Sequence, residues 1–389
     1  FRSSSNFPFA YSVAGGDTAS AFAAGCPVIV KAHPAHPGTG ELVGRLIVEA
    51  VKESGLPEGS FSLLFDGGFA VGQGLVKHPL VKAVGFTGSL KGGRMLVDLA
   101  AARPEPIPVY AEMGSTNPVF ILPGAIAERA PALVEGLHAS ATLNVGQFCT
   151  NPGLIVLERS PEAEKFMSAL TAKLNATPEG AMLTPGIRKN FVTNTAARAK
   201  LLGVKVIAQA KSAAVCGAAP MWFETDAGVF LEQRGLSEEI FGPSSLVVWC
   251  RDRAELDEVA RHLEGSLTEP LQVGATERTG HAELIELLAW KVGRVILNGY
   301  PTGLEVSPAI VHGGPYPATS DGGRSTSVGT RALHRWARLV CYQNFADDLL
   351  QTELQNANPR GLLRLVNGEY TRAGVESDPF SRKAAKNAK

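Results

Sequence analysis

The chain has 389 residues, of which 45% are hydrophobic and 19% are charged. This balance is typical of a folded globular protein and excludes an intrinsically disordered one, and the length favours two or three domains. Basic and acidic residues both number 37, so the formal net charge is zero. The sequence therefore lacks the basic excess that would indicate nucleic acid or an anionic membrane as a partner.

The cysteines form neither a CxxC pair nor a Cys/His cluster with the spacing of zinc ligands. Their odd number, 5, argues against a disulfide framework, so we expect a reducing, cytoplasmic compartment. The most apolar stretch, residues 7–30, is interrupted by Asp17 and Thr18, and predicts neither a membrane span nor a signal peptide. The chain begins with Phe1 rather than Met and enters a motif at once, so we expect an N-terminal truncation.

Strands and helices alternate in the first third of the chain. Leu42, Leu46, Ile47 and Ala50 recur at helical spacing within one of the helices, and predict its buried face. The alternation predicts parallel strands joined by right-handed crossovers, in an open sheet that binds ligands at the carboxyl ends of its strands. The expected strands span residues 27–30, 61–65 and 83–86, and the helices span 39–52, a stretch ending at 78, and 93–102.

A proline-rich stretch, residues 104–108, predicts a rigid linker to a second α/β segment. We therefore expect an α/β protein with two open, Rossmann-like domains built on parallel sheets. The expected parts are 1–108, 109–304, a return segment at 305–350 with a candidate oligomerisation strand, and a polar C-terminal tail at 351–389. In the second part, helices are expected at 125–143, 162–174 and 255–263, and strands at 154–157, 246–249 and 294–297.

A glycine-containing turn closes the third predicted strand. Phe86-Thr87-Gly88-Ser89 is followed by Gly93 at a helix start, which would let backbone N–H groups face a phosphate. The same spacing is typical of a strand-to-helix turn that binds nothing. The sequence G-x-G-x-x-G does not occur here, so the usual dinucleotide fingerprint is missing.

Several single residues could carry chemistry. Cys149 lies in a predicted loop beside glycine and Asn-Pro, where it is either a nucleophile or a small buried hydrophobic residue. Glu112 ends a strand, where burial would raise its pKa towards that of a general base, although a salt bridge is the alternative. His33 and His36 are each followed by proline and have no third ligand, so we expect no metal there.

Taken in order, the motifs resemble the aldehyde dehydrogenase superfamily. Three longer segments, 13–18, 31–37 and 312–319, are most similar to its α-ketoglutarate semialdehyde (2,5-dioxovalerate) dehydrogenase branch. The resemblance covers about residues 1–350, and its motifs are Asn6-Phe7-Pro8, Val30-Lys31, Phe86-Thr87-Gly88-Ser89, Glu112-Met113-Gly114, Asn117-Pro118, Gly146-Gln147-Phe148-Cys149, Glu239-Ile240-Phe241-Gly242-Pro243, Asn298-Gly299 and Pro301-Thr302-Gly303.

The resemblance implies a reaction and the residues that carry it. Cys149 would attack the aldehyde to give a thiohemiacetal and then a thioester, which Glu112 hydrolyses by activating water. The amide of Asn6 would hold the oxyanion. The implied cofactor-binding residues are Lys31, His33, Phe86, Thr87, Gly88, Ser89, Gly93, Glu239 and Phe241, and the implied substrate-binding residues are Phe7, Phe148 and Thr150.

Three departures from the family pattern bear on the function. Pro34 stands where many NAD-preferring relatives have a glutamate, which favours NADP over NAD as cofactor. The family's N-terminal quarter is missing, and the stretch between Cys149 and Glu239 is short. We expect a homo-oligomer, a dimer or tetramer, that oxidises α-ketoglutarate semialdehyde.

Four other functional hypotheses stay open. One is an NADP-dependent long-chain aldehyde dehydrogenase, and another is an inactive truncated homologue that acts as a binding protein. An acylating enzyme of the same fold would not need Glu112. A cysteine hydrolase would need a histidine, and His138 is the nearest candidate in sequence to Cys149.

Overall fold

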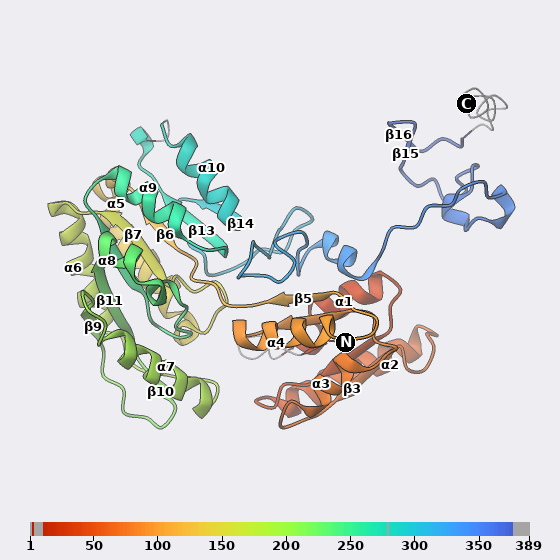
Figure 1. Ribbon diagram of the computed structural model, residues 1–389, viewed down its shortest axis with the longest axis horizontal. Helices are drawn as coiled ribbons and strands as arrows, with labels where there is room; N and C mark the ends of the chain where they lie inside the picture. The colour runs from red at the N-terminus through yellow and green to blue at the C-terminus, as the bar shows by residue number, and fades with distance from the viewer. Residues whose placement is uncertain (1, 4–10, 278–279, 376–389) are drawn as a thin grey trace. The chain divides into compact units, whose positions relative to one another are not determined.

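The structure is a computed structural model that describes residues 2–3, 11–277 and 280–375. It divides into two compact units, Phe1–Ala337 and Arg338–Lys389. Among the described residues, the first unit holds two large sheets with their helices (Figure 1) and a two-stranded antiparallel sheet of β8 (Gly180–Ala181) and β10 (Gly217–Ala218). No helix of the described chain is long and apolar enough to cross a membrane.

The first sheet is parallel throughout and, in the described residues, has the order β3-β2-β1-β4-β5. The predicted strands of this part are therefore confirmed. The sheet also continues past residue 108, because Thr87 pairs with Glu112. The strands are β1 (Arg2–Ser3), β2 (Val28–Lys31), β3 (Phe61–Leu64), β4 (Val84–Thr87) and β5 (Val109–Glu112).

Helices cover both faces of the first sheet. On one face α1 (Gly16–Ala23) and α2 (Pro37–Glu53) pack on the cluster of Val28, Val30 and Phe61. On the other face α3 (Ala70–Lys77) and α4 (Leu90–Ala101) enclose Val84.

The predicted buried face of α2 is wrong in part. Leu42 and Leu46 are 58% and 57% exposed, whereas Gly40 and Gly44 are buried. Gly44 is close to β3, since a Cβ there would lie 2.6 Å from a methyl carbon of Leu63. The helix therefore approaches the sheet closely at its small residues, and Val43, Ile47 and Val51 pack on the core beside them.

The second sheet has seven strands in the described chain, in the order β14-β13-β6-β7-β12-β11-β9. All neighbours are parallel except β9, which runs antiparallel to β11 at the edge. The strands are β6 (Val119–Ile121), β7 (Leu154–Glu158), β9 (Lys205–Gln209), β11 (Met221–Asp226), β12 (Leu246–Cys250), β13 (Ser266–Gln272) and β14 (Val292–Leu297).

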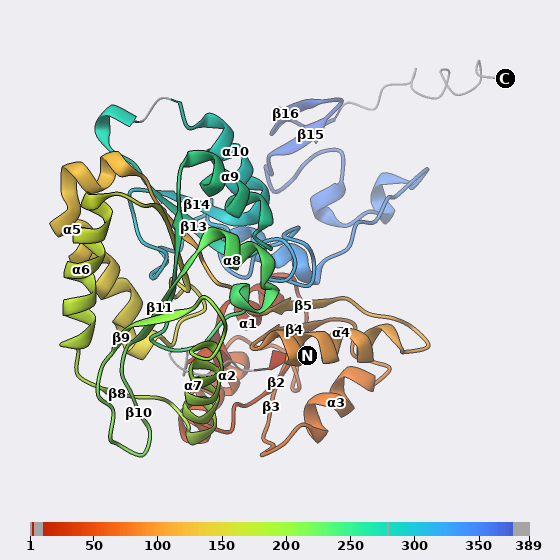
Figure 2. The same cartoon turned by 60° about the vertical axis from the view of Figure 1, so that its left-hand side comes forward.

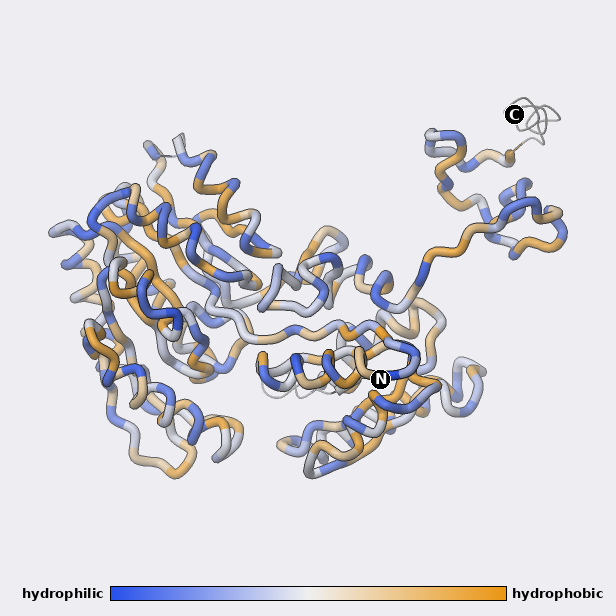
Figure 3. Tube along the Cα trace, in the orientation of Figure 1, coloured by the Kyte–Doolittle hydropathy of each residue, from blue (hydrophilic) through white to orange (hydrophobic). Residues whose placement is uncertain are grey.

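Alternation along each central strand divides the second core into two layers. In β7, Ile155 and Leu157 face α5 and α6, whereas Leu154 and Val156 face the opposite helices. Figure 2 shows the sheet between the two helix layers, and Figure 3 shows how hydrophobic its strands are. The helices are α5 (Pro123–Thr142) and α6 (Pro161–Asn175) on one side, and α8 (Ala227–Glu232), α9 (Arg253–His262) and α10 (Ala282–Lys291) on the other.

Residues 298–337 return to the first sheet. Thr319 forms a bridge with Glu112, and the backbone N–H of Ser320 donates to the Ala111 carbonyl at 3.0 Å. Farther along, Arg335 pairs with the buried Asp17 at 3.2 Å. The contacts of Thr319 and Ser320 hold residues 298–337 against the end of β5, and the pair of Arg335 with Asp17 holds them against α1.

The candidate oligomerisation strand stays a prediction, because only a single chain is described. Residues 305–350 are all described, and they contain no strand. The second unit instead has a small antiparallel hairpin of β15 (Arg364–Val366) and β16 (Glu369–Thr371).

Candidate active site

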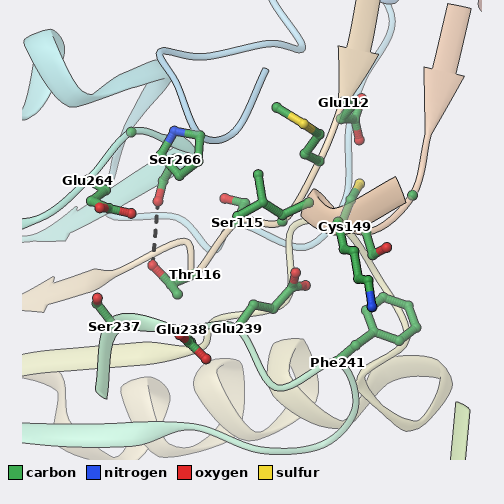
Figure 4. A pocket seen from close by; sticks show the side chains of 18 of the residues that line it. Glu112, Ser115, Thr116, Cys149, Ser237, Glu238, Glu239, Phe241, Glu264 and Ser266 are labelled. Atoms are coloured by element: carbon green, nitrogen blue, oxygen red, sulfur yellow. Dashed lines mark hydrogen bonds between the residues drawn. The ribbon is translucent and has the colours of Figure 1, made fainter. Parts of the chain in front are cut away.

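A cleft of about 1160 Å³ opens at the carboxyl ends of β4 and β5. This is where an open parallel sheet places its ligands. Figure 4 shows Glu112 and Cys149 side by side, with Glu239 and Phe241 projecting towards the same space. The predicted residues that line the cleft are Thr87, Gly88, Ser89, Glu112, Cys149, Glu239 and Phe241.

Cys149 follows a tight turn at the end of α5. Asn144, Val145 and Gly146 have φ angles of 47°, 60° and 63°. The left-handed region is unfavourable for a β-branched residue such as Val145, so the turn is strained. Gly146 is required by close packing as well, because a Cβ there would lie 2.4 Å from the Gly242 backbone.

A buried asparagine holds the Cys149 loop. The side-chain amide of Asn117 donates to the carbonyl oxygens of Cys149 and Asn151 at 2.9 and 3.0 Å. Its oxygen accepts hydrogen bonds from Ser115 and Thr268. Asn117 thus fixes the position of the cysteine relative to the segment that follows β5.

The thiol of Cys149 lies beside a histidine and a carboxylate. Nε2 of His312 is 3.6 Å from Sγ of Cys149 and 3.2 Å from Oε1 of Glu112. The side chains of His312 and Glu112 are only 10% and 6% exposed. Ser327 Oγ donates to the other oxygen of Glu112 at 3.5 Å. The return segment therefore completes a cluster whose other members come from β5 and the Cys149 loop.

The electrostatics of this cluster place the proton on sulfur. Burial, and then the charge of Glu112, raise the pKa of the Cys149 thiol well above its ordinary value. Burial by itself would raise the pKa of Glu112, but the charge of His312 and hydrogen bonds from His312 and Cys149 outweigh it and hold that pKa low. The thiol must therefore pass its proton to a neighbour before the sulfur can act as a nucleophile.

The turn after β4 is built to leave a helix end open to the cleft. Ser89 is the N-cap of α4, and its side chain accepts a hydrogen bond from the Gly92 N–H at 3.2 Å. Gly93 lets α4 approach the end of β5, since a Cβ there would lie 2.6 Å from the sulfur of Met113. The ring of Phe86 packs against this turn, next to Gly88.

Glu239 is an unusual acid in the cleft. Burial raises its pKa to about 8, although a hydrogen bond from the Ser115 backbone opposes the rise. Its carboxylate lies beside Gly114, where a Cβ would be 2.9 Å from Oε2. At neutral pH Glu239 can therefore donate as well as accept a hydrogen bond.

Lys31 and His33 lie outside the residues that line the cleft. Burial lowers the pKa of Lys31, while the charge of Asp66 opposes this. Burial, followed by the charges of His36 and Lys31, lowers the pKa of His33 to about 4. His33 is thus neutral at pH 7. Asp66 places a carboxylate near Lys31, which the sequence alone did not predict.

The remaining predicted residues are placed as follows. Asn6 and Phe7 lie outside the described residues. Phe148 is half-buried and Thr150 is buried, and neither lines the cleft. His138, the histidine considered for a cysteine hydrolase, instead hydrogen-bonds Thr177 at 2.7 Å.

Sequence reasoning missed two residues of the site. His312 lies 163 positions from Cys149, and only its place in the segment 312–319 drew attention to it. Arg294 on β14 is the second; it does not line the cleft and is linked to Cys149 through its charge. Its guanidinium donates to the carbonyls of Pro301 and Gly303 at 3.0 and 3.2 Å, and a negative charge on Cys149 is close enough to oppose the lowering of its pKa by burial.

The chain is similar to two curated bacterial proteins. The α-ketoglutaric semialdehyde dehydrogenase 2 of Azospirillum brasilense is 51% identical over 366 residues, which is 94% of this chain and 70% of that protein. The α-ketoglutaric semialdehyde dehydrogenase of Acinetobacter baylyi is 45% identical over 369 residues, with the same two shares.

Solved structures confirm the predicted α/β fold. A glyceraldehyde-3-phosphate dehydrogenase of Methanocaldococcus jannaschii, crystallised with NADP, superposes with a TM-score of 0.73 over 86% of this chain and 70% of that chain, at 20% identity. A lactaldehyde dehydrogenase gives a TM-score of 0.72 over 86% of this chain and 68% of its own, at 21% identity. Residues 3–315 match the aldehyde dehydrogenase family, and the chain belongs to that family.

Proposed function

We propose that the chain oxidises α-ketoglutaric semialdehyde to its carboxylic acid, with Cys149 as nucleophile and a nicotinamide cofactor as oxidant. The substrate rests on relatives of that name that are 51% and 45% identical to this chain. The chemistry rests on one observation, the contact of the Cys149 thiol with His312 and, through it, with Glu112 at the cleft.

The first step makes the sulfur nucleophilic. The thiol proton moves to the carboxylate of Glu112, which accepts a hydrogen bond from the thiol, as Sγ bonds to the aldehyde carbon, and this gives a thiohemiacetal. The charge of His312 holds the pKa of Glu112 low, so the carboxylate is ionised beforehand and releases the accepted proton to solvent afterwards. The backbone N–H of Cys149 and the amide of Asn6 are the proposed donors to the oxyanion.

The second half of the reaction releases the acid. A bound nicotinamide would supply the hydride acceptor, and loss of hydride from the substrate carbon would leave a thioester on Cys149. Glu112 lies close enough to the sulfur to take a proton from a water that attacks this thioester. Glu112 then returns this proton to the departing sulfur, which restores the thiol.

The cleft fits a dinucleotide. The open N-terminus of α4 at Ser89 would take the pyrophosphate, and Glu239 would hydrogen-bond the nicotinamide ribose beside Phe241. Thr87, Gly88 and Gly93 would shape this turn, as the close packing at Gly88 and Gly93 supports.

The choice between NAD and NADP depends on two opposing charges. Lys31 would attract the 2′-phosphate of NADP, and Pro34 removes a carboxylate that would repel it. Asp66 restores a negative charge near Lys31, and the neutral His33 adds no positive one. We therefore propose that both cofactors bind, with a modest preference for NADP.

Arg294 would bind the distal carboxylate of the semialdehyde. A negative charge on Cys149 would raise the pKa of Arg294, so the two groups are near each other. The Arg294 guanidinium is held by the carbonyls of Pro301 and Gly303. A half-buried arginine binds a carboxylate more tightly than an exposed one, because fewer water molecules compete. Phe148 and Thr150, next to Cys149, are proposed to line the remainder of the substrate pocket, together with Phe7.

An activity measurement tests the proposed function. Reduced cofactor is followed at fixed enzyme concentration with α-ketoglutaric semialdehyde, hexanal and decanal, each with NAD and NADP, and Cys149→Ser is run alongside. The semialdehyde should give the highest kcat/KM, and the variant should give no turnover. A higher kcat/KM for decanal would favour the long-chain alternative, and equal turnover by the variant would refute the mechanism.

A second experiment tests the role of His312. His312→Gln removes the charge that holds the pKa of Glu112 low but keeps a hydrogen-bonding side chain, so proton transfer to Glu112 should slow and kcat should fall by about 10²–10⁴-fold. Alkylation of Cys149 by iodoacetamide at pH 7 should slow in parallel, and both rates should recover as the pH rises. A variant that loses kcat while its alkylation rate stays that of the parent would restrict His312 to a later step.

A further inference from the structure

The active-site cluster offers three different metal ligands in one place. Oxygen of Glu112, Sγ of Cys149 and nitrogen of His312 all lie within 4.8 Å of one another. Thiolate, imidazole and carboxylate are the three side-chain ligand types that bind Zn²⁺ in proteins. The sequence did not suggest this set, because its members come from β5, the Cys149 loop and the return segment.

Two of the three spacings between the ligand atoms match the edges of a tetrahedron around zinc, and the third, from Sγ of Cys149 to the Glu112 oxygen, lies within 4.8 Å. Bonds of about 2.3 Å to sulfur and about 2.05 Å to nitrogen or oxygen at tetrahedral angles separate S from N by about 3.6 Å and N from O by about 3.3 Å. The corresponding distances here are 3.6 Å from Cys149 to His312 and 3.2 Å from His312 to Glu112. An ion could therefore bind with little movement of the side chains.

The surroundings of the cluster hold its ligands in place and leave one side open. The His312 and Glu112 side chains are only 10% and 6% exposed, and Asn117 and Ser327 restrain the Cys149 loop and the Glu112 carboxylate. Cys149 and Glu112 also line the cleft, so the fourth position of a tetrahedral ion would face solvent or substrate. Three protein ligands with one open position describe a site that exchanges its metal more readily than a closed structural site.

We propose that Zn²⁺ binds reversibly at Cys149, His312 and Glu112, one ion per chain, and inhibits the enzyme. Binding replaces the thiol proton with the S–Zn bond and releases that proton to solvent, while neutral His312 binds through Nε2 and the carboxylate of Glu112 through oxygen. No oxidant is needed. The bound ion occupies the sulfur that must attack the aldehyde, so the enzyme is inactive until a chelator or a competing thiol removes the metal.

Metal binding is tested without reference to activity. The untagged full chain is titrated with ZnCl₂ against a chromogenic zinc chelator, and separately with CoCl₂ under anaerobic conditions. We expect one Zn²⁺ per chain, and a near-ultraviolet thiolate-to-cobalt charge-transfer band. His312→Gln should weaken the affinity by at least about 100-fold, because loss of even an outer-shell partner of a ligand costs 10–100-fold.

Three controls make the result specific. Cys149→Ser should abolish the cobalt charge-transfer band, whereas Cys341→Ser removes an exposed thiol elsewhere and should leave the band unchanged. His262→Gln changes a histidine that lines the same cleft outside the cluster and should keep the parent's affinity. Circular dichroism of each variant checks that it is folded.

The proposal fails if His312→Gln binds Zn²⁺ as tightly as the parent, or if the cobalt band persists in Cys149→Ser. These readouts are independent of the proposed oxidation. Tight, His312-dependent binding in a chain that oxidises no aldehyde would support the metal site and contradict the proposed function. Full activity in a chain that binds no Zn²⁺ would support the proposed function and contradict the metal site.

Discussion

The carboxyl of Glu239 should make the stability of the unliganded protein depend on pH. Burial raises its pKa from 4.5 to about 8, which corresponds to about 5 kcal/mol against the ionised form in the folded state. This is an upper limit, because the side chain lines a cleft that water enters, and we expect about 1–3 kcal/mol.

The sign of the effect follows from linkage. In the unfolded chain Glu239 loses its proton near pH 4.5, whereas in the folded chain it keeps the proton up to about pH 8. The contribution of this group to the free energy of unfolding is therefore complete below pH 4.5 and is lost as the pH rises through about 8. Glu239→Gln cannot ionise, so the variant should gain stability relative to the parent between pH 5 and pH 9.

Urea unfolding of the unliganded protein at pH 5, 7 and 9 measures this difference. Glu238→Gln is the matched control, because Glu238 is the neighbouring residue and is exposed. Its free energy of unfolding should equal that of the parent at every pH. A difference between Glu239→Gln and the parent that is the same at pH 5 and pH 9 would refute the reasoning.

Three further changes have defined outcomes. Arg294→Met should raise KM for α-ketoglutaric semialdehyde at least about 10-fold but leave KM for hexanal near the parent value, since only the first substrate offers a carboxylate. Asn117→Asp keeps the shape and the tolerance of φ 45° but loses the donors to Cys149 and Asn151, so urea unfolding should show a loss of about 2–5 kcal/mol. Glu269 is 0% exposed, neither carboxylate oxygen has a hydrogen-bond partner in the described structure, and burial raises its pKa well above 4.5. Glu269→Gln should therefore raise the Tm relative to the parent at pH 8 but not at pH 4, and an equal shift at both would contradict the effect of charge.

Local patterns predicted the elements well but not their contacts. The apolar runs at 154–157 and 246–249 correspond to β7 and β12. Each strand is buried on both faces, so its residues form a continuous apolar run that can be identified from the local sequence alone. The face of α2 was misjudged because hydrophobic spacing gives no weight to glycine, whereas Gly40 and Gly44 are the residues buried on that helix. Burial there depends on the close approach of the backbone, which a periodic pattern does not contain.

The active site shows the same limit. Cys149 and Glu112 belong to short motifs and were identified from the sequence, and the cleft brings both together. His312 reaches them only because residues 298–337 return to the end of β5, a long-range contact that no local pattern encodes. The positive φ of Val145 is equally hidden, since the position is held by tertiary packing against an unfavourable local preference.

The central claim is that a covalent acyl group forms on Cys149 and that Glu112 removes it. Glu112→Gln is mixed with α-ketoglutaric semialdehyde and NADP, quenched in acid within one turnover, and digested for peptide mass spectrometry. We predict the mass of one acyl group on the peptide that contains Cys149, formed in step with one equivalent of reduced cofactor. Reduction of the cofactor without any adduct on that peptide would contradict the mechanism.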